Sequence, residues 1–434
     1  MKVLKWVFLL AVAAAAFLTG GWLLRRGATA AGKGATAGTD VAANNRLFAA
    51  VLQTVRTYAV DSLDEASVYR LATSGMLTEL GDPYAGVVAD ADTTDARGRI
   101  GPAPVQGIYL DLLDDLVTVV SVVSGSPASV AGIRPGDAVL RVDRTVIGTQ
   151  RADQVAAMID GAPGSEVKLR LGRERASAPL AVTLARGAVP ALAEPLFELQ
   201  NVTGYLKLSQ VDDRAVAAAA DGMAKVGAVS GGRGLILDLR GVAAGSLAAA
   251  VRLAELFLAD GQAIVTTRGR NGKDSATIRS HKQAPGRDFP MVVLTNRGTG
   301  GPAEVVAGAL QDHDRAVVVG EETFGRGVGY SFFPLGNGTS LRLTTAVWAT
   351  PSGRVIQRLP VADRSQAATD STPPRPKFTT DAGRTVLGGG GITPDREVPT
   401  GVEAEGSDRA LALARDLLAR ATSRQSLMAV LQAK

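Results

Sequence analysis

The fold of this chain is decided by the stretch MVVLTNRGTGGPAEVVAGALQD, residues 291–312, and by AVVVGEETFGRG, residues 316–327, close behind it. Met291 to Thr295 is a short apolar run that predicts a buried strand, and Ala303 to Leu310 has the composition of a packed helix. Ala316 to Val319 is a second apolar run, and Gly-rich turns mark the ends of these segments. Strands that alternate with helices predict a mixed, largely parallel sheet with both faces covered.

The same alternation extends on the amino-terminal side of this stretch. Residues 204–210 read as a strand, and residues 234–240 read as a buried strand that is followed by a helix at Ser246 to Leu258. We therefore assign an α/β core to residues 195–400. A closing amphipathic helix is expected within residues 405–434, where apolar residues recur at helical spacing.

A separate module precedes the core, and glycines and prolines mark the turns between its predicted elements. Ser126-Pro127 begins a short predicted helix that Gly132 ends, and Gly136-Asp137 turns the chain into a strand at Ala138 to Val142. Apolar runs lie on both sides of these turns. The pattern resembles a PDZ domain, to which we assign residues 100–188.

The resemblance to PDZ domains implies a peptide-binding site at Gly107, Ile108, Tyr109 and Leu110. The backbone N–H groups of this loop are expected to take the terminal carboxylate of a peptide, while the neighbouring strand pairs with the peptide. Protein C-termini or unfolded peptides are then the expected partners. Tyr109 occupies a place where a small residue is usual, so its ring either narrows the groove or points to solvent.

The amino-terminus carries a targeting segment. Lys2 and Lys5 precede an uncharged run at residues 6–24, which is about the length that spans a bilayer as a helix. We interpret residues 1–26 as a signal anchor in the inner membrane, with a cleaved signal peptide as the alternative. Residues 27–44 are expected to be a linker and residues 45–98 a helical region, both on the periplasmic side.

The two stretches that open this section closely resemble the carboxy-terminal processing peptidases, or tail-specific proteases. In that family the first stretch reads roughly N-x-G-S-A-S-A-x-E-I, where the second Ser is the nucleophile. The second ends T-F-G-K-G-x-V-Q, where Lys is the general base and Gln orients it. Laid over this chain, these positions are Gly301, Arg326 and Tyr330. The resemblance implies a ClpP- or crotonase-like core in a degenerate member of the family.

The residues at these positions exclude the usual chemistry. Glycine has no side chain with which to attack, and arginine stays protonated and cannot accept a proton. The family's oxyanion loop, N-x-P-G-G, is GVAAG at residues 241–245, with Gly241, Ala244 and Gly245 as the equivalent positions. We therefore expect a pseudopeptidase that binds protein C-termini or partner proteases as a scaffold or regulator.

Two other readings stay open. The first is an active serine peptidase of the same family, for which a shift of the alignment would offer Thr299 as a substitute hydroxyl. The second is an envelope structural protein in which the PDZ domain alone matters.

Composition excludes several further classes of function. The two histidines, His281 and His313, are expected in solvated segments, so a His-based triad or zinc site is not predicted. The chain has no cysteine, and no phosphate-binding loop with its Lys appears, so no metal and no cofactor is expected. Its net charge is +5, but a basic stripe with interleaved aromatics is absent from the sequence, which argues against nucleic acid as a partner.

Overall fold

The computed structural model describes part of the 434-residue chain, namely residues 41–61, 63–90, 104–113, 115–148, 150–173, 176–200, 202–229, 234–270, 275–281, 289–358, 375–399 and 408–432. The predicted anchor at residues 1–26 lies outside these residues, as does most of the predicted linker. None of the helices that the structure describes is both long and apolar enough to span a bilayer. By their contacts the residues form two compact units, Met1–Met76 and Leu77–Lys434.

The first unit contains helix α2 (Val41–Tyr58) and most of helix α3 (Glu65–Glu79). The helical spacing of apolar residues predicted this pair correctly. Helix α2 begins earlier than expected, because residues 41–44, which we had placed in the linker, already form its first turn. The rest of the predicted helical region is not all helix, since residues 86–89 form strand β1 (Gly86–Ala89) of the second unit.

The module that resembles a PDZ domain contains a five-stranded antiparallel sheet of order β2-β3-β4-β6-β7, and the short strand β5 pairs with β4. Its elements are β2 (Ile108–Leu113), β3 (Leu116–Val122), α4 (Pro127–Val130), β4 (Ala138–Val142), β5 (Thr145–Val146), α5 (Ala152–Ile159), β6 (Glu166–Gly172) and β7 (Leu180–Ala185). The Ser126 side chain accepts a hydrogen bond from the Ser129 N–H and so caps α4, as its sequence predicted. Strand β2 is the end strand of this sheet.

The peptidase-like core is built on a six-stranded sheet of order β19-β14-β13-β10-β9-β8. Its strands are β8 (Leu196–Gln200), β9 (Thr203–Lys207), β10 (Gly234–Asp238), β13 (Met291–Thr295), β14 (Val317–Gly320) and β19 (Arg396–Glu397). Every neighbouring pair is parallel except β8 with β9. This confirms the mixed, largely parallel sheet that the sequence predicted.

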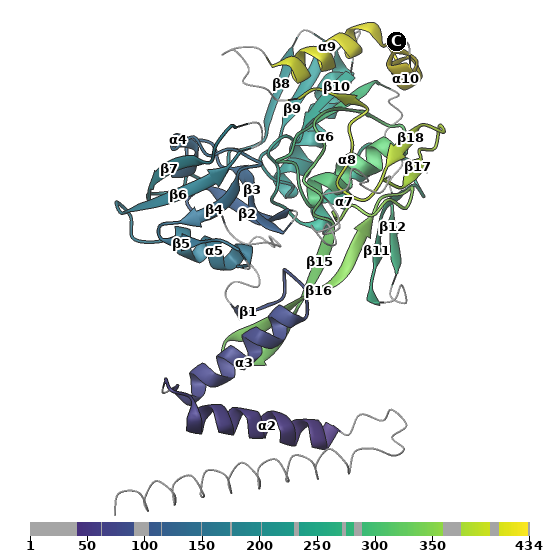
Figure 1. Ribbon diagram of the computed structural model, residues 1–434. Helices are drawn as coiled ribbons and strands as arrows, with labels where there is room; N and C mark the ends of the chain where they lie inside the picture. Colours follow the sequence, from purple (N-terminus) through teal and green to yellow (C-terminus); the bar gives the residue numbers. More distant parts are fainter. Residues whose placement is uncertain are drawn as a thin grey trace, which may run out of the picture. The chain divides into compact units, whose positions relative to one another are not determined.

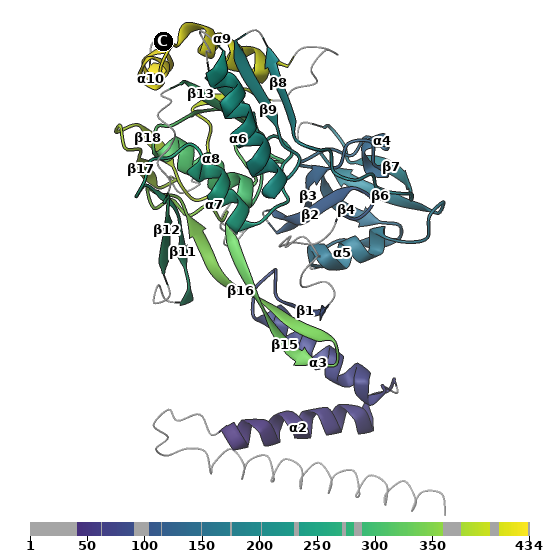
Figure 2. The same ribbon diagram turned by 180° about the vertical axis from the view of Figure 1, so that it is seen from behind.

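Helices cover both faces of this sheet (Figures 1 and 2). One face packs against α6 (Asp213–Ala228), α7 (Leu247–Glu255) and α8 (Pro302–Asp312). The other face packs against α9 (Arg409–Arg420) and α10 (Arg424–Gln432). The carboxyl-terminal segment is therefore two helices, where we had predicted one. Ser423 explains the break, because its side chain accepts from the Ser426 N–H and so begins a new helix.

A second sheet extends from the core and has the order β1-β16-β11-β12, with β15 paired to β16. Its longer strands are β11 (Ala263–Arg268), β12 (Ala276–Arg279), β15 (Val328–Gly336) and β16 (Thr339–Ala349). A small hairpin, β17 (Lys377–Thr379) and β18 (Thr385–Leu387), follows. Strand β15 begins two residues after Arg326, so this sheet positions one side of the candidate site.

His313 lies at the carboxyl end of α8, where we had predicted a solvated side chain. That prediction was wrong, because the residue is only 7% exposed. Its Nδ1 lies 2.7 Å from Asp381 Oδ2, and its Nε2 lies 2.7 Å from the carbonyl oxygen of Ala263. His313 therefore connects the end of α8 to β11 and to the β17–β18 hairpin, which is a structural role.

Candidate functional site

The turn between β13 and α8 brings Gly301 to the amino-terminal end of the helix. Gly301 is the N-cap residue with φ +61° and ψ −120°, a conformation that residues with a Cβ rarely adopt. Pro302 follows at the first helical position, where its missing N–H costs nothing and its fixed φ suits the helix. The nucleophile position of the family is therefore a glycine in a backbone conformation that would strain a residue with a Cβ.

Arg326 lies directly against Gly301. A Cβ placed on Gly301 would be 3.0 Å from Arg326 Nη2 and 3.2 Å from its Nε, so the predicted nucleophile and base positions are neighbours. The side chain is 7% exposed, and its Nη2 donates a hydrogen bond to the carbonyl oxygen of Ala243. The guanidinium thus fills the space between the nucleophile position and the loop at residues 241–245.

The residues around Arg326 stabilise its positive charge. Burial acts to lower the pKa of Arg326, but the neighbouring Tyr330 and Asp111 outweigh it, so the pKa is raised overall. Arg326 Nη1 lies 3.4 Å from Asp111 Oδ2, and both side chains are less than 10% exposed. A cation in this setting cannot act as a general base.

Glu304 connects the turn before α8 with the loop before β15. Its carboxylate accepts hydrogen bonds from the backbone N–H groups of Gly301 (2.8 Å), Gly325 (2.7 Å) and Arg326 (2.8 Å), and from the Thr323 hydroxyl. Burial raises the pKa of Glu304, while these donors oppose the shift. The one side chain thereby fixes the turn before α8 relative to the loop before β15. Glu304 belongs to the sequence motif, but its role emerges only from these contacts.

The loop equivalent to the oxyanion loop is bonded to other parts of the protein. The N–H of Gly241 donates to Asn296 Oδ1 at 2.9 Å, and the carbonyl of Ala244 accepts from Val211 at 2.9 Å. A Cβ on Gly245 would lie 2.4 Å from the carbonyl oxygen of Val211, so a glycine is required there. The structure brings this loop next to Gly301, and the first N–H of the loop, that of Gly241, is already bonded.

Thr299 has a structural role. It is fully buried, its hydroxyl donates to the carbonyl of Leu239 at 2.8 Å, and it accepts from the N–H of Asn296 at 3.0 Å. These bonds direct the hydroxyl toward the backbone at the end of β10, which disfavours Thr299 as a substitute nucleophile.

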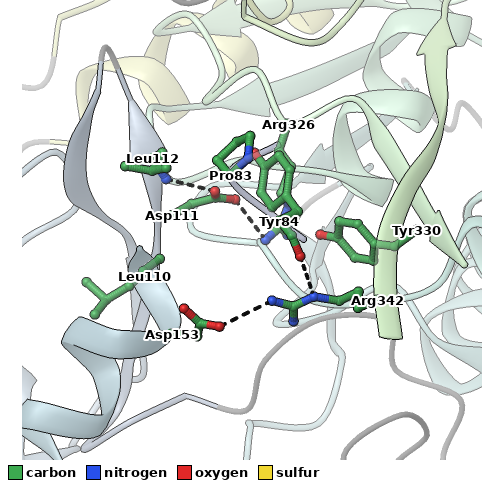
Figure 3. A pocket seen from close by; sticks show the side chains of 10 residues that line it. Pro83, Tyr84, Leu110, Asp111, Leu112, Asp153, Arg326, Tyr330 and Arg342 are labelled. Atoms are coloured by element: carbon green, nitrogen blue, oxygen red, sulfur yellow. Dashed lines mark hydrogen bonds and ion pairs between the residues drawn. The ribbon is translucent and has the colours of Figure 1, made fainter. Parts of the chain in front are cut away.

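Tyr330, at the position of the orienting Gln, lies with Arg326 in a shared pocket (Figure 3). Its ring centroid is 5.5 Å from that of Tyr84, and the guanidinium carbon of Arg342 lies 5.8 Å from the ring centre. Burial raises the pKa of Tyr330 and raises that of Tyr84 well above its usual value. The pocket is lined by Pro83, Tyr84, Leu110, Asp111, Leu112, Ala152, Asp153, Arg326, Tyr330 and Arg342.

Residues from three parts of the chain meet in this pocket, and sequence reasoning missed several of them. Arg342 Nε donates to the carbonyl of Tyr84 at 2.7 Å, and Arg342 also lies 3.6 Å from Asp153 of the PDZ helix α5. Asp111 could have been noticed as the single acidic residue within the apolar strand IYLDLL, residues 108–113. Nothing in the sequence indicates that Arg326 is its partner.

The predicted peptide loop forms a tight turn. Gln106 and Gly107 have φ of 49° and 89°, and Val105 and Ile108 exchange two backbone hydrogen bonds across them. A Cβ on Gly107 would be 2.1 Å from Ser126 Oγ, which requires glycine there. The N–H of Ile108 is thus bonded to Val105 at 2.8 Å in this structure.

Tyr109 does not point to solvent, as one of our two expectations had it. It is 7% exposed and packs in a cluster with Val120, Val123, Ala243, Ala244 and Phe324. Because the last three residues belong to the peptidase-like core, Tyr109 contributes to the packing of the PDZ domain on that core. Among the described residues, no group of three or more His, Cys, Asp or Glu side chains could hold a metal ion.

Comparison with known proteins assigns both domains. Residues 202–363 match the model of peptidase family S41, and residues 104–184 match that of the PDZ domain. The chain is 32% identical over 315 residues to the carboxy-terminal-processing protease of Bartonella bacilliformis, covering 71% of this chain and 72% of that protein. It is 29% identical to the carboxy-terminal processing protease CtpA of Bacillus subtilis, covering 66% of this chain and 61% of that protein.

A solved structure supports the fold. The photosystem II D1 C-terminal processing protease superposes with a TM-score of 0.61 at 22% identity, covering 89% of this chain and 91% of that one. Together with the sequence match to the Bartonella protein over more than two thirds of both chains, these findings place the chain in peptidase family S41, among the carboxy-terminal processing proteases with a PDZ domain.

Proposed function

We propose that this chain is a pseudopeptidase that recognises protein C-termini or partner proteins, and that it works as a scaffold or regulator. The observation that carries the proposal is the guanidinium of Arg326, which lies against Gly301 where a reacting carbonyl and a nucleophile would have to meet. A hydroxyl nucleophile and a neutral base are the minimum for covalent peptide hydrolysis. Neither group is present at these positions.

The experiment that tests the loss of hydrolysis uses the purified chain with unstructured substrates that have apolar tails. We expect no cleavage and no labelling by a serine-reactive fluorophosphonate. Labelling of a core residue at a rate comparable to that of an active serine peptidase would overturn the proposal. It would instead favour the alternative suggested by the names of the relatives, an active peptidase that cleaves proteins near their C-termini.

Peptide recognition by the PDZ domain is the second part of the proposal. A PDZ domain generally adds a peptide to the edge of its sheet and captures the terminal carboxylate with backbone N–H groups. A short peptide strand buries little surface, and ordering the peptide costs free energy, so we expect micromolar affinity. A labelled peptide with an apolar carboxyl-terminal residue should bind, and amidation of its terminus should weaken binding about tenfold, because an ionised acceptor is lost. Equal affinity for both forms would mean that the groove is closed.

We also propose that the domains lie in the periplasm and that residues 6–24 anchor the chain in the inner membrane. The support is the uncharged run flanked by Lys5 and Arg25. A reporter enzyme that is active only in the periplasm, fused after residue 44, should be active in cells. An inactive reporter would contradict this location.

A further inference from the structure

Helix α2, purple in Figure 1, leaves most of its side chains exposed. From Ala42 to Tyr58 only Leu52 is partly buried. Large apolar side chains between 38% and 79% exposed lie along it, namely Leu47, Phe48, Val51, Val55 and Tyr58. None of these five belongs to a hydrophobic cluster of the residues that the structure describes. A helix that packs on nothing is marginal in water, and an exposed apolar patch marks a site of interaction, so a further surface is needed to cover it.

The apolar side chains of α2 share one face. At 3.6 residues per turn, the large apolar side chains from Leu47 to Tyr58 fall within roughly 140° of the helix circumference. Arg46 and Gln53 lie on the opposite side. A stripe this wide exceeds the narrow seam of a coiled coil, and the 18 residues of α2 are fewer than the roughly three heptads typical of one. The pattern therefore favours a broad apolar partner over a second helix.

The charged residues of α2 are both basic. They are Arg46 and Arg56, and the helix contains no Asp or Glu. The nearest acidic residues, Asp61, Asp64 and Glu65, follow the helix. Arg56 Nη1 lies 3.6 Å from Glu65 Oε2, but these side chains are 44% and 62% exposed, and such a pair contributes little. An amphipathic helix with Phe and Leu on one side and basic residues on the other binds in the headgroup region of a bilayer.

The proposed anchor puts a bilayer within reach of this helix. Residues 25–40 separate the apolar run at residues 6–24 from α2. Even a fully extended chain of this length spans at most about 60 Å. A tethered helix therefore meets the bilayer surface at a high effective concentration, whereas a second copy has to be encountered by diffusion. This step rests on the proposed anchoring of the chain in the inner membrane.

We propose that α2 lies in the plane of the membrane surface, with its face from Leu47 to Tyr58 inserted among phospholipid headgroups and upper acyl chains. Insertion of such helices reaches about 5–10 Å into the boundary between headgroups and acyl chains. The aliphatic parts of the Arg46 and Arg56 side chains allow their guanidinium groups to reach lipid phosphates, which favours anionic lipids. The helix thus holds the start of the described chain against the bilayer.

The test uses the full chain in nanodiscs of phosphatidylcholine and phosphatidylglycerol. The chain has no cysteine, so one fluorophore can be attached at a single introduced cysteine. Val51→Cys and Val55→Cys report on the apolar face, Gln53→Cys and Thr57→Cys report on the opposite face, and Ala13→Cys reports on the anchor. We expect a quencher carried on lipid acyl chains to quench the labels at 51 and 55, and aqueous iodide to quench those at 53 and 57.

Two serine variants, each with the label at Val51→Cys, test the apolar face. Phe48→Ser should shift the equilibrium between inserted and free α2 about tenfold toward the free form, because transfer of an aromatic side chain out of water is lost. The matched control Ala49→Ser places the same residue on the opposite, exposed side and should leave the equilibrium unchanged. Nanodiscs of phosphatidylcholine alone should reduce insertion about threefold, because the attraction of the arginines to anionic lipid is lost.

The outcomes separate this proposal from the proposed anchor. Iodide quenching on both faces of α2 without lipid quenching would overturn the membrane-surface helix. Protection of the label at 51 from both quenchers would also overturn it, and energy transfer between labelled copies would then identify a second copy as the cover. Equal effects of Phe48→Ser and Ala49→Ser would overturn the role of the apolar face, and equal insertion in both lipid mixtures would overturn the preference for anionic lipid. If lipid does not quench the label at Ala13→Cys, the anchor is refuted, while the labels at 51 and 55 still decide the position of α2.

Discussion

Restoring the missing side chains with Gly301→Ser and Arg326→Lys should not yield an efficient peptidase. The backbone at Gly301 has φ +61° and ψ −120°, and holding a residue with a Cβ in such a region costs on the order of 1–3 kcal/mol. The shorter lysine removes the clash at 3.0 Å between the new Cβ and Arg326 Nη2. The new serine is therefore tolerated in space but strained in conformation.

The new lysine would be a poor base for an electrostatic reason. Asp111 Oδ2 lies 3.4 Å from the present guanidinium, and an opposite charge this close favours the protonated amine. Loss of general-base assistance is worth roughly 10²–10⁴-fold in rate. The loop at residues 241–245 lacks the Pro and one Gly of the family's oxyanion loop, and loss of one oxyanion donor is worth about 10²–10³-fold. We therefore expect the double variant to be at least about 10⁴-fold slower than an active family member.

The assay is fluorophosphonate labelling and cleavage of an unstructured substrate, measured for the double variant and for the same protein with Asp111→Asn added. The third substitution should increase labelling, because it removes the charge that keeps the lysine protonated. If the double variant cleaves within tenfold of an active relative, the argument from Asp111 and the altered loop is refuted.

Two further predictions concern stability. Glu304→Gln should lower the free energy of unfolding, measured in urea, by about 2–4 kcal/mol, because an amide N–H₂ would face the backbone N–H groups that now donate to the carboxylate. The control Glu166→Gln changes an exposed side chain and should alter the free energy of unfolding by no more than about 0.5 kcal/mol. Equal effects of the two substitutions would contradict the role of Glu304. Burial acts to raise the pKa of Asp408, but hydrogen bonds from Arg240 and from the Leu411 N–H outweigh it and hold the pKa below the usual 3.8. The ionised carboxylate therefore stabilises the fold above pH 3.8, and this contribution is lost as the pH falls through the folded-state pKa. Asp408→Asn should therefore cost up to about 1 kcal/mol at neutral pH and flatten the acid side of the stability curve, whereas parallel curves would rule this out.

Local elements were predictable from the sequence because their signals are local. The run Met291–Thr295 became β13 without a change of bounds, and Ser126-Pro127 marked the start of α4. The C-terminal helices show the limit of periodicity. Apolar residues recur at helical spacing on both sides of the polar run at residues 422–426, so the pattern favoured one helix. The capping by Ser423 was the weaker signal that decided the outcome.

The candidate site could be predicted only in part, for a different reason. Aligned motifs located Gly301 and Arg326, because each motif is a short continuous segment. Their partners come from far away in the sequence, since Asp111 is 215 residues from Arg326 and Asp381 is 68 residues from His313. Burial of a charged side chain depends on whether such a partner arrives. A single sequence does not reveal these pairings, which is why His313 was misjudged and Asp111 was missed.

The contacts of Glu304 also explain how the framework of a peptidase site can persist when the residues at the nucleophile and base positions change. A nucleophile contributes little to folding, so replacing it with glycine relieves strain at a positive φ and leaves the fold intact. The carboxylate that binds three backbone N–H groups is different, because its loss would leave buried donors without partners. Stability therefore preserves the frame around Gly301 whether or not the chain hydrolyses peptides. In that frame the buried Arg326 forms an ion pair with Asp111 of the PDZ domain, so the framework of the site is also a contact between the two domains.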